Sequence, residues 1–358
     1  MYNARLTKLR KLMSARSIDA MLITNLSNVF YLSGFTGSTA ALVVTDDSSY
    51  ILVDFRYTLQ ATNECIGTQV VQYSGKPTIT ALGDLINEIK PQSLGYESDV
   101  VTVVFYRKLR SVVDTSVKLR SAVGLVAKLR SVKDEHEILL IRRAAEIADA
   151  VYEHIIHEIK PGMTEKDVAL LIDSSVRRLG GDKEGFDTIA AFGPNAASPH
   201  ASPTDAILKS GQLLKMDYGV SYKKYNSDIT RTVCLGTSTT RQKEIYKIVL
   251  DAQLRAIDAI APGKTGKEID AVARDYIASK GYGDNFGHGL GHAIGIEVHD
   301  GPAFSMLSDI TLEPGMVATV EPGIYIEGWG GVRIEDDVLV TETGVEIITK
   351  APKEFTCI

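Results

Sequence analysis

Cysteine is scarce in this sequence, and its scarcity excludes several classes of protein. The three cysteines among 358 residues are Cys65, Cys234 and Cys357, and because they are scattered and odd in number they indicate neither a disulfide framework nor a zinc-binding spacing. Long apolar runs are also lacking: no stretch approaches the ~18 apolar residues of a membrane-spanning helix, and no apolar segment of signal-peptide length follows the basic N-terminus. We therefore expect a cytoplasmic protein with no membrane partner.

Positive charge is also in short supply. Lys and Arg number 39 against 45 Asp and Glu, and the resulting net charge of −6 at pH 7 argues against nucleic acid as a partner. The segment 107–133 is an exception, because Lys-Leu-Arg-Ser recurs there at 108, 118 and 128. We interpret it as a set of solvated faces on short strands near a domain junction, with a binding patch for something acidic as the alternative. Its period of ten residues is too short for a solenoid repeat.

The remaining composition suits an ordinary globular protein, with 44% apolar and 23% charged residues and a length sufficient for two domains. Residues 4–16 predict an amphipathic helix, and residues 20–24, 40–45 and 50–53 predict strands. These elements indicate a small α/β domain over residues 1–125, with a boundary within 120–133 and a second domain over 126–358. Asp54, Arg56 and Tyr57 follow the third strand and either face a ligand or form a satisfied polar cluster.

The second domain opens on a long helix and contains an internal repeat. Asp134 and Glu137 have the spacing of a capping box, and apolar residues from 138 to 159 recur at alternating spacings of three and four, which predicts one buried stripe. That helix ends in IKPGMTEKDVALLI, and a second helix, over about 241–260, ends in IAPGKTGKEIDAVA. Pro161 and Pro262 are 262 − 161 = 101 residues apart. We expect two matching halves, each built of a helix, a turn, a helix, a strand and a hairpin.

The same repeat relates two pairs of carboxylates. Asp217 and Asp228 lie in the hairpin sequence of the first half, and Glu321 and Glu335 in that of the second, at offsets of 321 − 217 = 104 and 335 − 228 = 107. A turn near residues 222–224 would bring the two aspartates across from each other. His292 lies among glycines, which allow a close approach of the backbone. Two Asp, two Glu and one His in one cleft are an oxygen-rich set that suits a pair of divalent ions better than a structural zinc.

Several segments resemble the pita-bread metallopeptidases over roughly residues 130–358: FDTIAAFGPNAASPH, MDYGVSYKKYNSDITRT, GHGLGHAIGIEVHDGP and EPGIYIEGWGGVRIEDDVLV. The earlier segments SNVFYLSGFTGSTA and ILVDFRY are similar to the preceding domain of the Xaa-Pro branch, which includes aminopeptidase P and prolidase. The resemblance implies an α/β (α+β) fold. Its parts would be a small N-terminal α/β domain and a pseudo-symmetric C-terminal pita-bread domain with a curved, mainly antiparallel sheet.

Matched motif by motif, the resemblance implies two divalent metal ions, with Mn²⁺ expected and Co²⁺ or Zn²⁺ as alternatives. The implied ligands are Asp217, Asp228, His292, Glu321 and Glu335, with Asp228 and Glu335 bridging the ions. The implied catalytic residues are Glu321 as proton shuttle, His200, His288, His299 and Arg333, and the implied substrate-binding residues are Phe186 and Tyr325. For His200 and His299 the alternative is a satisfied buried histidine, and for Arg333 it is neutralisation of the acid cluster.

The implied reaction is metal-assisted hydrolysis of the bond before proline, which releases the first residue of Xaa-Pro peptides longer than two residues. A strict Xaa-Pro dipeptidase is the alternative, and a metal-free amidinohydrolase or a non-catalytic binding protein of the same fold is more remote. The partners implied are small proline-containing peptides and a second copy of the chain in a homodimer. Phe186, Ile189 and the backbone near His288 are expected to pack around the proline ring. Phe192 departs from the family pattern and is expected to narrow the pocket.

Overall fold

The computed structural model describes residues 1–301 and 303–358. The chain divides into two compact units, Met1–Arg130 and Ser131–Ile358. The division falls near the end of helix α6 (Leu125–Ser131). It lies a few residues after the boundary at 125/126 that we expected from the sequence. No helix among the described residues is both long and apolar enough to cross a membrane.

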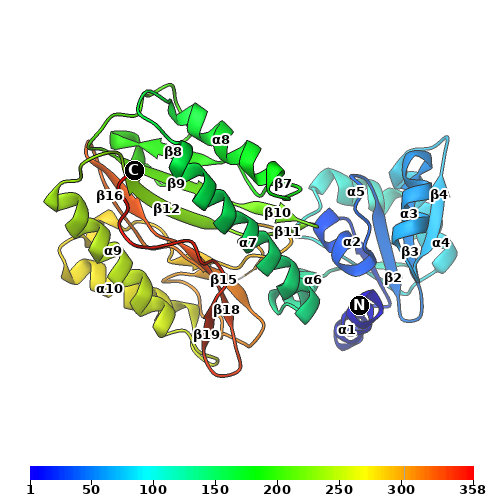
Figure 1. The fold of residues 1–358 in the computed structure, drawn as a ribbon. Helices are drawn as coiled ribbons and strands as arrows, with labels where there is room; N and C mark the ends of the chain where they lie inside the picture. Colours follow the sequence, from blue (N-terminus) through cyan, green and yellow to red (C-terminus); the bar gives the residue numbers. More distant parts are fainter. Residues whose placement is uncertain (302) are drawn as a thin grey trace. The chain divides into compact units, whose positions relative to one another are not determined.

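The first unit is a six-stranded sheet with helices on both faces (Figure 1). Its strands are β1 (Ala20–Ile23), β2 (Ala41–Thr45), β3 (Ser49–Asp54), β4 (Gln69–Tyr73), β5 (Ser93–Tyr96) and β6 (Lys118–Ser121), in the order β4-β3-β2-β1-β5-β6. Its helices are α1 (Tyr2–Ala15), α2 (Leu26–Ser33), α3 (Thr58–Glu64), α4 (Thr78–Ile89) and α5 (Val103–Val112), with a short 3₁₀ turn η1 (Phe55–Tyr57). Leu82 and Ile86 of α4 and Leu109 of α5 pack on one face of this sheet, and α1 and α2 contact β2.

The interpretation of the Lys-Leu-Arg-Ser segments as short strands is wrong for two of the three. Lys108 lies on α5 and Lys128 on α6, and only Lys118 begins a strand. The arginine of the first segment, Arg110, donates to the carbonyl oxygens of residues 113, 114 and 117. The arginine of the third, Arg130, is buried and donates to Asn28 Oδ1 at 2.7 Å. Arg110 and Arg130 therefore bind groups within their own unit, although the sequence suggested that the basic residues of these segments would be solvated.

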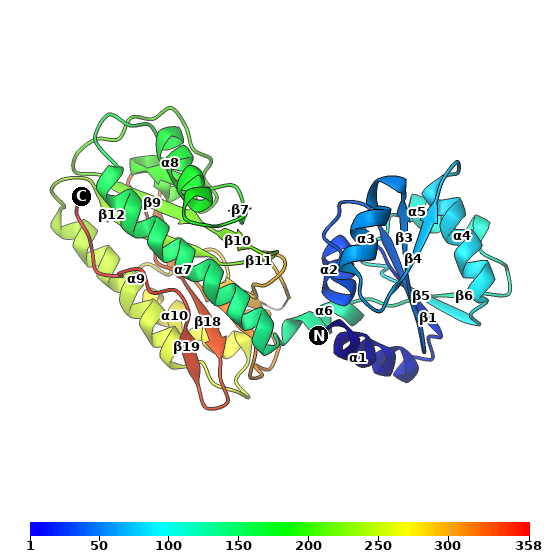
Figure 2. The ribbon, with the colours of Figure 1, turned by 45° about the vertical axis from the view of Figure 1, so that its right-hand side comes forward.

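Four helices frame the second unit, and each begins at a capping box. They are α7 (Glu135–Glu158), α8 (Glu165–Arg178), α9 (Thr240–Asp258) and α10 (Gly266–Ser279), capped by Asp134, Thr164, Thr239 and Thr265. A capping box satisfies backbone N–H groups that the first turn leaves without a partner. The cap at Asp134, predicted from its spacing to Glu137, is confirmed. The helix pairs α7–α8 and α9–α10 pack in separate apolar clusters, one for each half of the repeat (Figure 2).

Among the described residues, the strands of the second unit pair with one another in antiparallel fashion, and an isolated parallel bridge joins Cys234 to Cys357. In the first half they are β7 (Lys183–Glu184), β8 (Ile189–Phe192), β9 (Leu213–Tyr218), β10 (Val220–Tyr222), β11 (Tyr225–Asn226) and β12 (Ile229–Cys234). In the second half they are β13 (Gly291–His292), β14 (Ala303–Phe304), β15 (Val317–Val320), β16 (Gly323–Ile326), β17 (Gly330–Arg333), β18 (Asp336–Val340) and β19 (Val345–Ile347). Two 3₁₀ turns, η2 (Gly193–Ala197) and η3 (Gly283–Asn285), complete the unit. The predicted order of helix pair followed by antiparallel strands recurs in both halves.

Candidate active site

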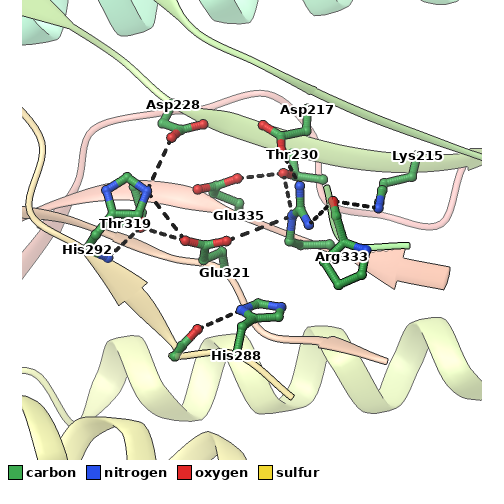
Figure 3. Close-up of polar contacts among 12 residues, drawn as sticks. Lys215, Asp217, Asp228, Thr230, His288, His292, Thr319, Glu321, Arg333 and Glu335 are labelled. Carbon is green, nitrogen blue, oxygen red and sulfur yellow. Dashed lines mark hydrogen bonds and ion pairs between the residues drawn. The ribbon is translucent and has the colours of Figure 1, made fainter. Parts of the chain in front are cut away.

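Two hairpins, one from each half, supply the predicted carboxylates. Asp217 lies on β9 and Asp228 immediately precedes β12, and these strands pair with Asp217 opposite Thr230. Lys223 and Lys224 form the turn between β10 and β11 with positive φ values of 49° and 73°, close to where the turn was predicted. Glu321 follows β15 and Glu335 precedes β18, which pairs with β15. Figure 3 shows the four carboxyl groups and His292 facing a common centre.

The closest group around that centre consists of Asp228, His292 and Glu335, whose ligand atoms all lie within 4.8 Å of one another. His292 Nε2 is 3.6 Å from Asp228 Oδ2 and 3.6 Å from Glu321 Oε1. Gly291 makes this placement possible, because a Cβ atom there would collide with the carbonyl oxygen of Thr319. His292 Nδ1 faces its neighbouring carbonyl oxygen, of Ala293, at 3.3 Å, which suits a proton on Nδ1 and a free lone pair on Nε2.

The burial of these groups tests whether they fit metal ions. Burial and the neighbouring carboxylates raise the pKa values of Asp228 and Glu335 well above their ordinary values, and burial raises the pKa of Glu321 to about 7. Burial and His299 lower the pKa of His292 to about 4, so this ring is neutral. The lone pair on Nε2 of the neutral imidazole and the carboxylate oxygens repel one another unless a cation lies among them. Asp217 Oδ1 and Asp228 Oδ1 are buried and have no hydrogen-bond partner among the residues that the structure describes, so the residue set fits divalent ions.

Arg333 ties the remaining polar groups together from β17. Its Nη2 forms an ion pair with Asp217, its Nη1 donates to Tyr325 Oη at 2.9 Å, and its Nε donates to Thr230 Oγ1 at 3.0 Å. Its Nε is also 3.9 Å from Glu321 Oε2. Arg333 is thus paired with acidic groups and also lines the cavity, and its role toward a substrate stays a prediction.

The other three predicted histidines, His200, His288 and His299, line the same cavity. His288 lies between two partners, with Nδ1 2.7 Å from the carbonyl oxygen of Gly289 and Nε2 2.9 Å from Tyr325 Oη. Burial and the Arg333 charge lower the pKa of His288 to about 4, so its ring is neutral. The ring of His299 lies 4.1 Å from that of His292, measured between centroids. His200 reaches the cavity from the segment that follows η2.

The cavity has a volume of about 580 Å³, and its lining includes every predicted site residue except Tyr325. Phe186 and Ile189, expected to contact the proline ring, are both in the lining. Tyr325 lies behind the cavity wall, with its hydroxyl bonded to Arg333 and His288, and its pKa is raised to about 12 by burial. Phe192, expected to narrow the pocket, is instead part of the apolar core under α7 and α8, because its position in β8 turns its side chain inward.

Sequence reasoning missed several residues that hold the site. Thr230 donates to Glu335 Oε2 at 2.5 Å, and Thr319 donates to Glu321 Oε1 at 3.3 Å. Lys215 is buried two residues before Asp217, and burial together with Arg333 lowers its pKa to about 6. The signal was present for Lys215, since a charge inside the apolar run LLKMDY and on the same strand face as Asp217 needs a partner.

Two matched halves that bring four carboxylates and a neutral histidine to one buried cavity define the class of metal-dependent hydrolases. The sequence model described as Metallopeptidase family M24 matches residues 140–342, and the one described as Creatinase/Prolidase N-terminal domain matches residues 5–132. This chain therefore belongs to metallopeptidase family M24, and it is a peptidase. The resemblance and the two-part α/β fold expected from the sequence are confirmed.

Three relatives extend over almost the whole chain. The structure of an Xaa-Pro dipeptidase from Bacillus anthracis is 41% identical in sequence, with a TM-score of 0.97 and coverage of 100% of both chains. An Xaa-Pro dipeptidase of Pyrococcus furiosus is 39% identical over 98% of this chain and 99% of its own. The structure of an X-Pro aminopeptidase from Thermotoga maritima is 39% identical, with a TM-score of 0.90 and coverage of 96% of this chain and 98% of its own.

Proposed function

We propose that this protein hydrolyses the peptide bond that precedes proline, with Xaa-Pro dipeptides as its main substrates. The observation that carries the proposal is the cavity of about 580 Å³, whose lining contains the carboxylates and His292 together with Phe186 and Ile189. The choice of dipeptides is supported by the similarity to the Xaa-Pro dipeptidases of Bacillus anthracis and Pyrococcus furiosus. It reverses the preference for longer peptides that we drew from the sequence.

The proposed metal ligands are the four carboxylates and the histidine at the centre of the cavity, namely Asp217, Asp228, His292, Glu321 and Glu335. Their support is the burial of like charges beside one another and the two buried aspartate oxygens that have no hydrogen bond within residues 1–301 and 303–358. Five such ligands exceed what one ion needs from a protein, so we propose two ions, with Mn²⁺ as the first candidate. When bound, divalent ions polarise the scissile carbonyl and make water a stronger nucleophile near neutral pH.

Glu321 is the residue that we propose to move the proton. Its carboxyl lies at the centre of the cavity, 3.6 Å from His292 Nε2 and 3.9 Å from Arg333 Nε. From there it can accept a proton from the attacking water and deliver it to the leaving nitrogen. The His200 and His299 rings lie in the cavity lining and would donate to the carbonyl oxygen as negative charge develops on it. Such a donor is typically worth ~3 kcal/mol of transition-state stabilisation.

The preference for proline follows from the chemistry of its nitrogen. The imide nitrogen of an Xaa-Pro bond carries no N–H, so the site needs no hydrogen-bond acceptor at that point and can place apolar surface around the ring. Phe186 and Ile189 supply this surface in the proposal. An alanine in place of proline would lose one set of apolar contacts, at a cost of ~1–3 kcal/mol, or roughly 10–200-fold in kcat/KM.

A second candidate is release of the first residue from longer Xaa-Pro peptides, favoured by the similarity to the X-Pro aminopeptidase of Thermotoga maritima. The test compares kcat/KM for Xaa-Pro, Xaa-Pro-Xaa and Xaa-Ala-Xaa peptides after loading with Mn²⁺, Co²⁺ or Zn²⁺. We expect Xaa-Pro to be cleaved fastest. Faster cleavage of Xaa-Pro-Xaa would establish the second candidate, and equal cleavage of Xaa-Ala-Xaa would end the proposal for proline.

We further propose that the protein acts as a homodimer in the cytoplasm. The support is the scattered cysteine content and the pita-bread resemblance. Sedimentation velocity of the metal-loaded protein tests the dimer, and a single species of monomer mass at micromolar concentration would contradict it.

A further inference from the structure

A buried lysine that the proposed mechanism does not use holds the segment leading to His200. Lys215 lies on β9, two residues before Asp217 and on the same strand face, and it is 0% exposed. Its Nζ donates to three backbone carbonyl oxygens, at 2.6 Å to Ser198, 3.1 Å to Pro199 and 3.4 Å to Ala196. Ala196 lies in η2, and Ser198 and Pro199 belong to the short stretch that connects η2 to His200.

The His200 ring depends on this stretch for its position. Its side chain is exposed toward the cavity, and within residues 1–301 and 303–358 the ring makes no hydrogen bond. Its backbone is held firmly, because the carbonyl oxygen of Pro199 accepts from Lys215 Nζ and from Arg333 Nη1, each at 3.1 Å. The backbone that precedes His200 therefore fixes the point from which its side chain extends into the cavity.

The second half of the repeat contains a corresponding residue with different chemistry. Thr319 precedes Glu321 by two residues, as Lys215 precedes Asp217, and both pairs are related by the same offset, 319 − 215 = 104 and 321 − 217 = 104. Thr319 Oγ1 accepts from the backbone N–H of His292 at 3.0 Å. In each half, the residue two before a carboxylate of the site thus fixes the backbone beside a histidine of the cavity.

A lysine is an unfavourable choice at this position unless its hydrogen bonds are needed. Burial of a charged group is costly unless other polar groups replace its water, and an apolar side chain of similar volume often serves stability as well or better. A lysine brings more than one N–H donor to a single atom at the end of a long side chain, and here three carbonyl oxygens lie within hydrogen-bond distance of that atom. The hydrogen bonds to these carbonyl oxygens therefore explain why a lysine is present at this buried position.

We propose that Lys215 is a positioning residue that fixes the backbone of residues 196–199 and so aims the His200 ring at the substrate carbonyl. The effect on turnover rests on the proposed function, whereas the hold on the backbone does not. The two parts are therefore tested by different measurements.

Hydrogen exchange tests the hold on the backbone without any need for activity. Lys215→Met removes the donors at nearly constant volume, and we expect amide exchange in residues 193–201 to accelerate at least about 10-fold, as for a segment that opens locally. The matched control is Lys353→Met, since Lys353 is a cation of the same unit whose Nζ pairs with Asp336 at 2.6 Å. Unchanged exchange in residues 193–201 of Lys215→Met, or equal acceleration in the control, would overturn the proposal.

A double-mutant cycle tests the link to His200. His200→Ala should lower kcat for Xaa-Pro about 100-fold in the parent protein, and Lys215→Met about 10- to 100-fold through misplacement of the ring. If Lys215 acts through His200, the second substitution adds less than about 3-fold to the first, while in the Lys353→Met background His200→Ala keeps its full effect. Multiplicative losses in the Lys215→Met background would overturn the proposal.

Two further measurements separate this proposal from failures of other kinds. If Lys215→Met does not fold, Lys215→Gln replaces it in the experiment. Glutamine offers two N–H donors without a charge, so this variant should fold and show an intermediate acceleration of exchange. The parent rate of exchange in Lys215→Gln would count against the proposal. If the parent protein does not cleave Xaa-Pro at all, the proposed function fails, and the exchange experiment still decides the role of Lys215.

Discussion

At the scale of single residues, the buried carboxylates of the second unit differ in what neutralises them. Asp336 is 0% exposed and pairs with Arg231 at 2.8 Å and with Lys353 at 2.6 Å. Burial alone would raise the pKa of Asp336, but the two cations hold it below its ordinary value of 3.8. Asp228 pairs with no lysine or arginine in the described part of the chain, and burial and the neighbouring carboxylates raise its pKa. Asp336 therefore stabilises the fold through its ion pairs, and Asp228 fits the ligand set of a metal ion.

Replacement of Asp336 should therefore destabilise the second unit. Asp336→Asn leaves the buried Arg231 without its counter-ion, and we expect a loss of ~3–5 kcal/mol in the free energy of unfolding. A group with a depressed folded pKa contributes stability above its unfolded pKa and loses it as pH falls through the folded value, so the parent should lose this contribution below about pH 3.8. Urea unfolding at pH 7 and at pH 3 measures both effects.

The control for that experiment is an exposed ion pair. Asp205 pairs with Lys166 at 2.9 Å while their side chains are 83% and 58% exposed. Asp205→Asn should change the unfolding free energy by no more than ~0.5 kcal/mol. A similar loss in both variants would show that the burial of Asp336 is not the cause.

A substitution of Glu321 distinguishes an effect on catalysis from an effect on stability. Glu321→Gln keeps the shape of the side chain but removes a charge and the oxygen that accepts the proton. We expect kcat for Xaa-Pro to fall by at least ~10²-fold, with a smaller relative change in the unfolding free energy because burial already disfavours the charged form. Steady-state kinetics and thermal unfolding on one preparation provide the comparison. Near-normal turnover would assign the proton transfer to another residue.

At the scale of elements, a pair of glycines allows β17 to lie against η2. A Cβ atom at Gly331 would collide with the carbonyl oxygen of Ala196, and one at Gly330 would come within 3.0 Å of that of Gly193. Because β17 carries Arg333 and η2 leads to His200, this contact joins the two halves of the site. The glycines of the sequence WGGVR are therefore required by the approach of two backbones.

Gly331→Ala should accordingly reduce stability and activity together. Overpacking at such a contact typically costs ~1–3 kcal/mol, and a shift of η2 would move His200. The control is Gly344→Ala, where an added Cβ meets no atom within 4 Å and a change within ~0.5 kcal/mol is expected. Chemical denaturation and kcat/KM for both variants test the prediction. Equal stability of the two would contradict the proposed contact.

Elements with local signals could be predicted from the sequence, and those set by tertiary contacts could not. The cap at Asp134 was predictable because its partner lies three residues away. The strand interpretation of the basic segments failed because similar four-residue sequences around Lys108 and Lys118 fold as helix and strand in different surroundings. Phe192 was misplaced for a related reason: its side chain packs into a core formed by α7 and α8, which no local pattern specifies.

At the scale of the whole molecule, the repeat made the candidate site predictable. Similar offsets between Asp217 and Glu321 and between Asp228 and Glu335 pointed to a shared centre, and these side chains do line one cavity. The partners of the supporting residues escaped prediction: the sequence marks Lys215 as a charge inside an apolar run, but only the fold shows the three carbonyl oxygens that surround it. The fold places such partners from distant parts of the sequence, so spacing alone does not identify them.

The same cluster makes the stability of the whole protein depend on metal and pH together. Without ions, Asp228, Glu321 and Glu335 have raised pKa values because they are buried among like charges. A carboxyl with a raised folded pKa stabilises the fold while protonated, and this contribution is lost as pH rises from the unfolded value to the folded one. For Glu321 that window runs from 4.5 to about 7.

We therefore expect the metal-free protein to lose stability as pH rises from about 5 to 7, and Mn²⁺ to reverse this loss. Ion binding to the folded state adds ~2.7 kcal/mol per site at a metal concentration 100 times Kd, and the gain should increase with pH because the ligands must be ionised. Calorimetric unfolding with a chelator and with Mn²⁺, at matched ionic strength, measures the effect across this range, and elemental analysis of the loaded protein should give about two ions per chain. Parallel stability curves with and without Mn²⁺, or full activity in the metal-free protein, would refute the assignment of these carboxylates as metal ligands.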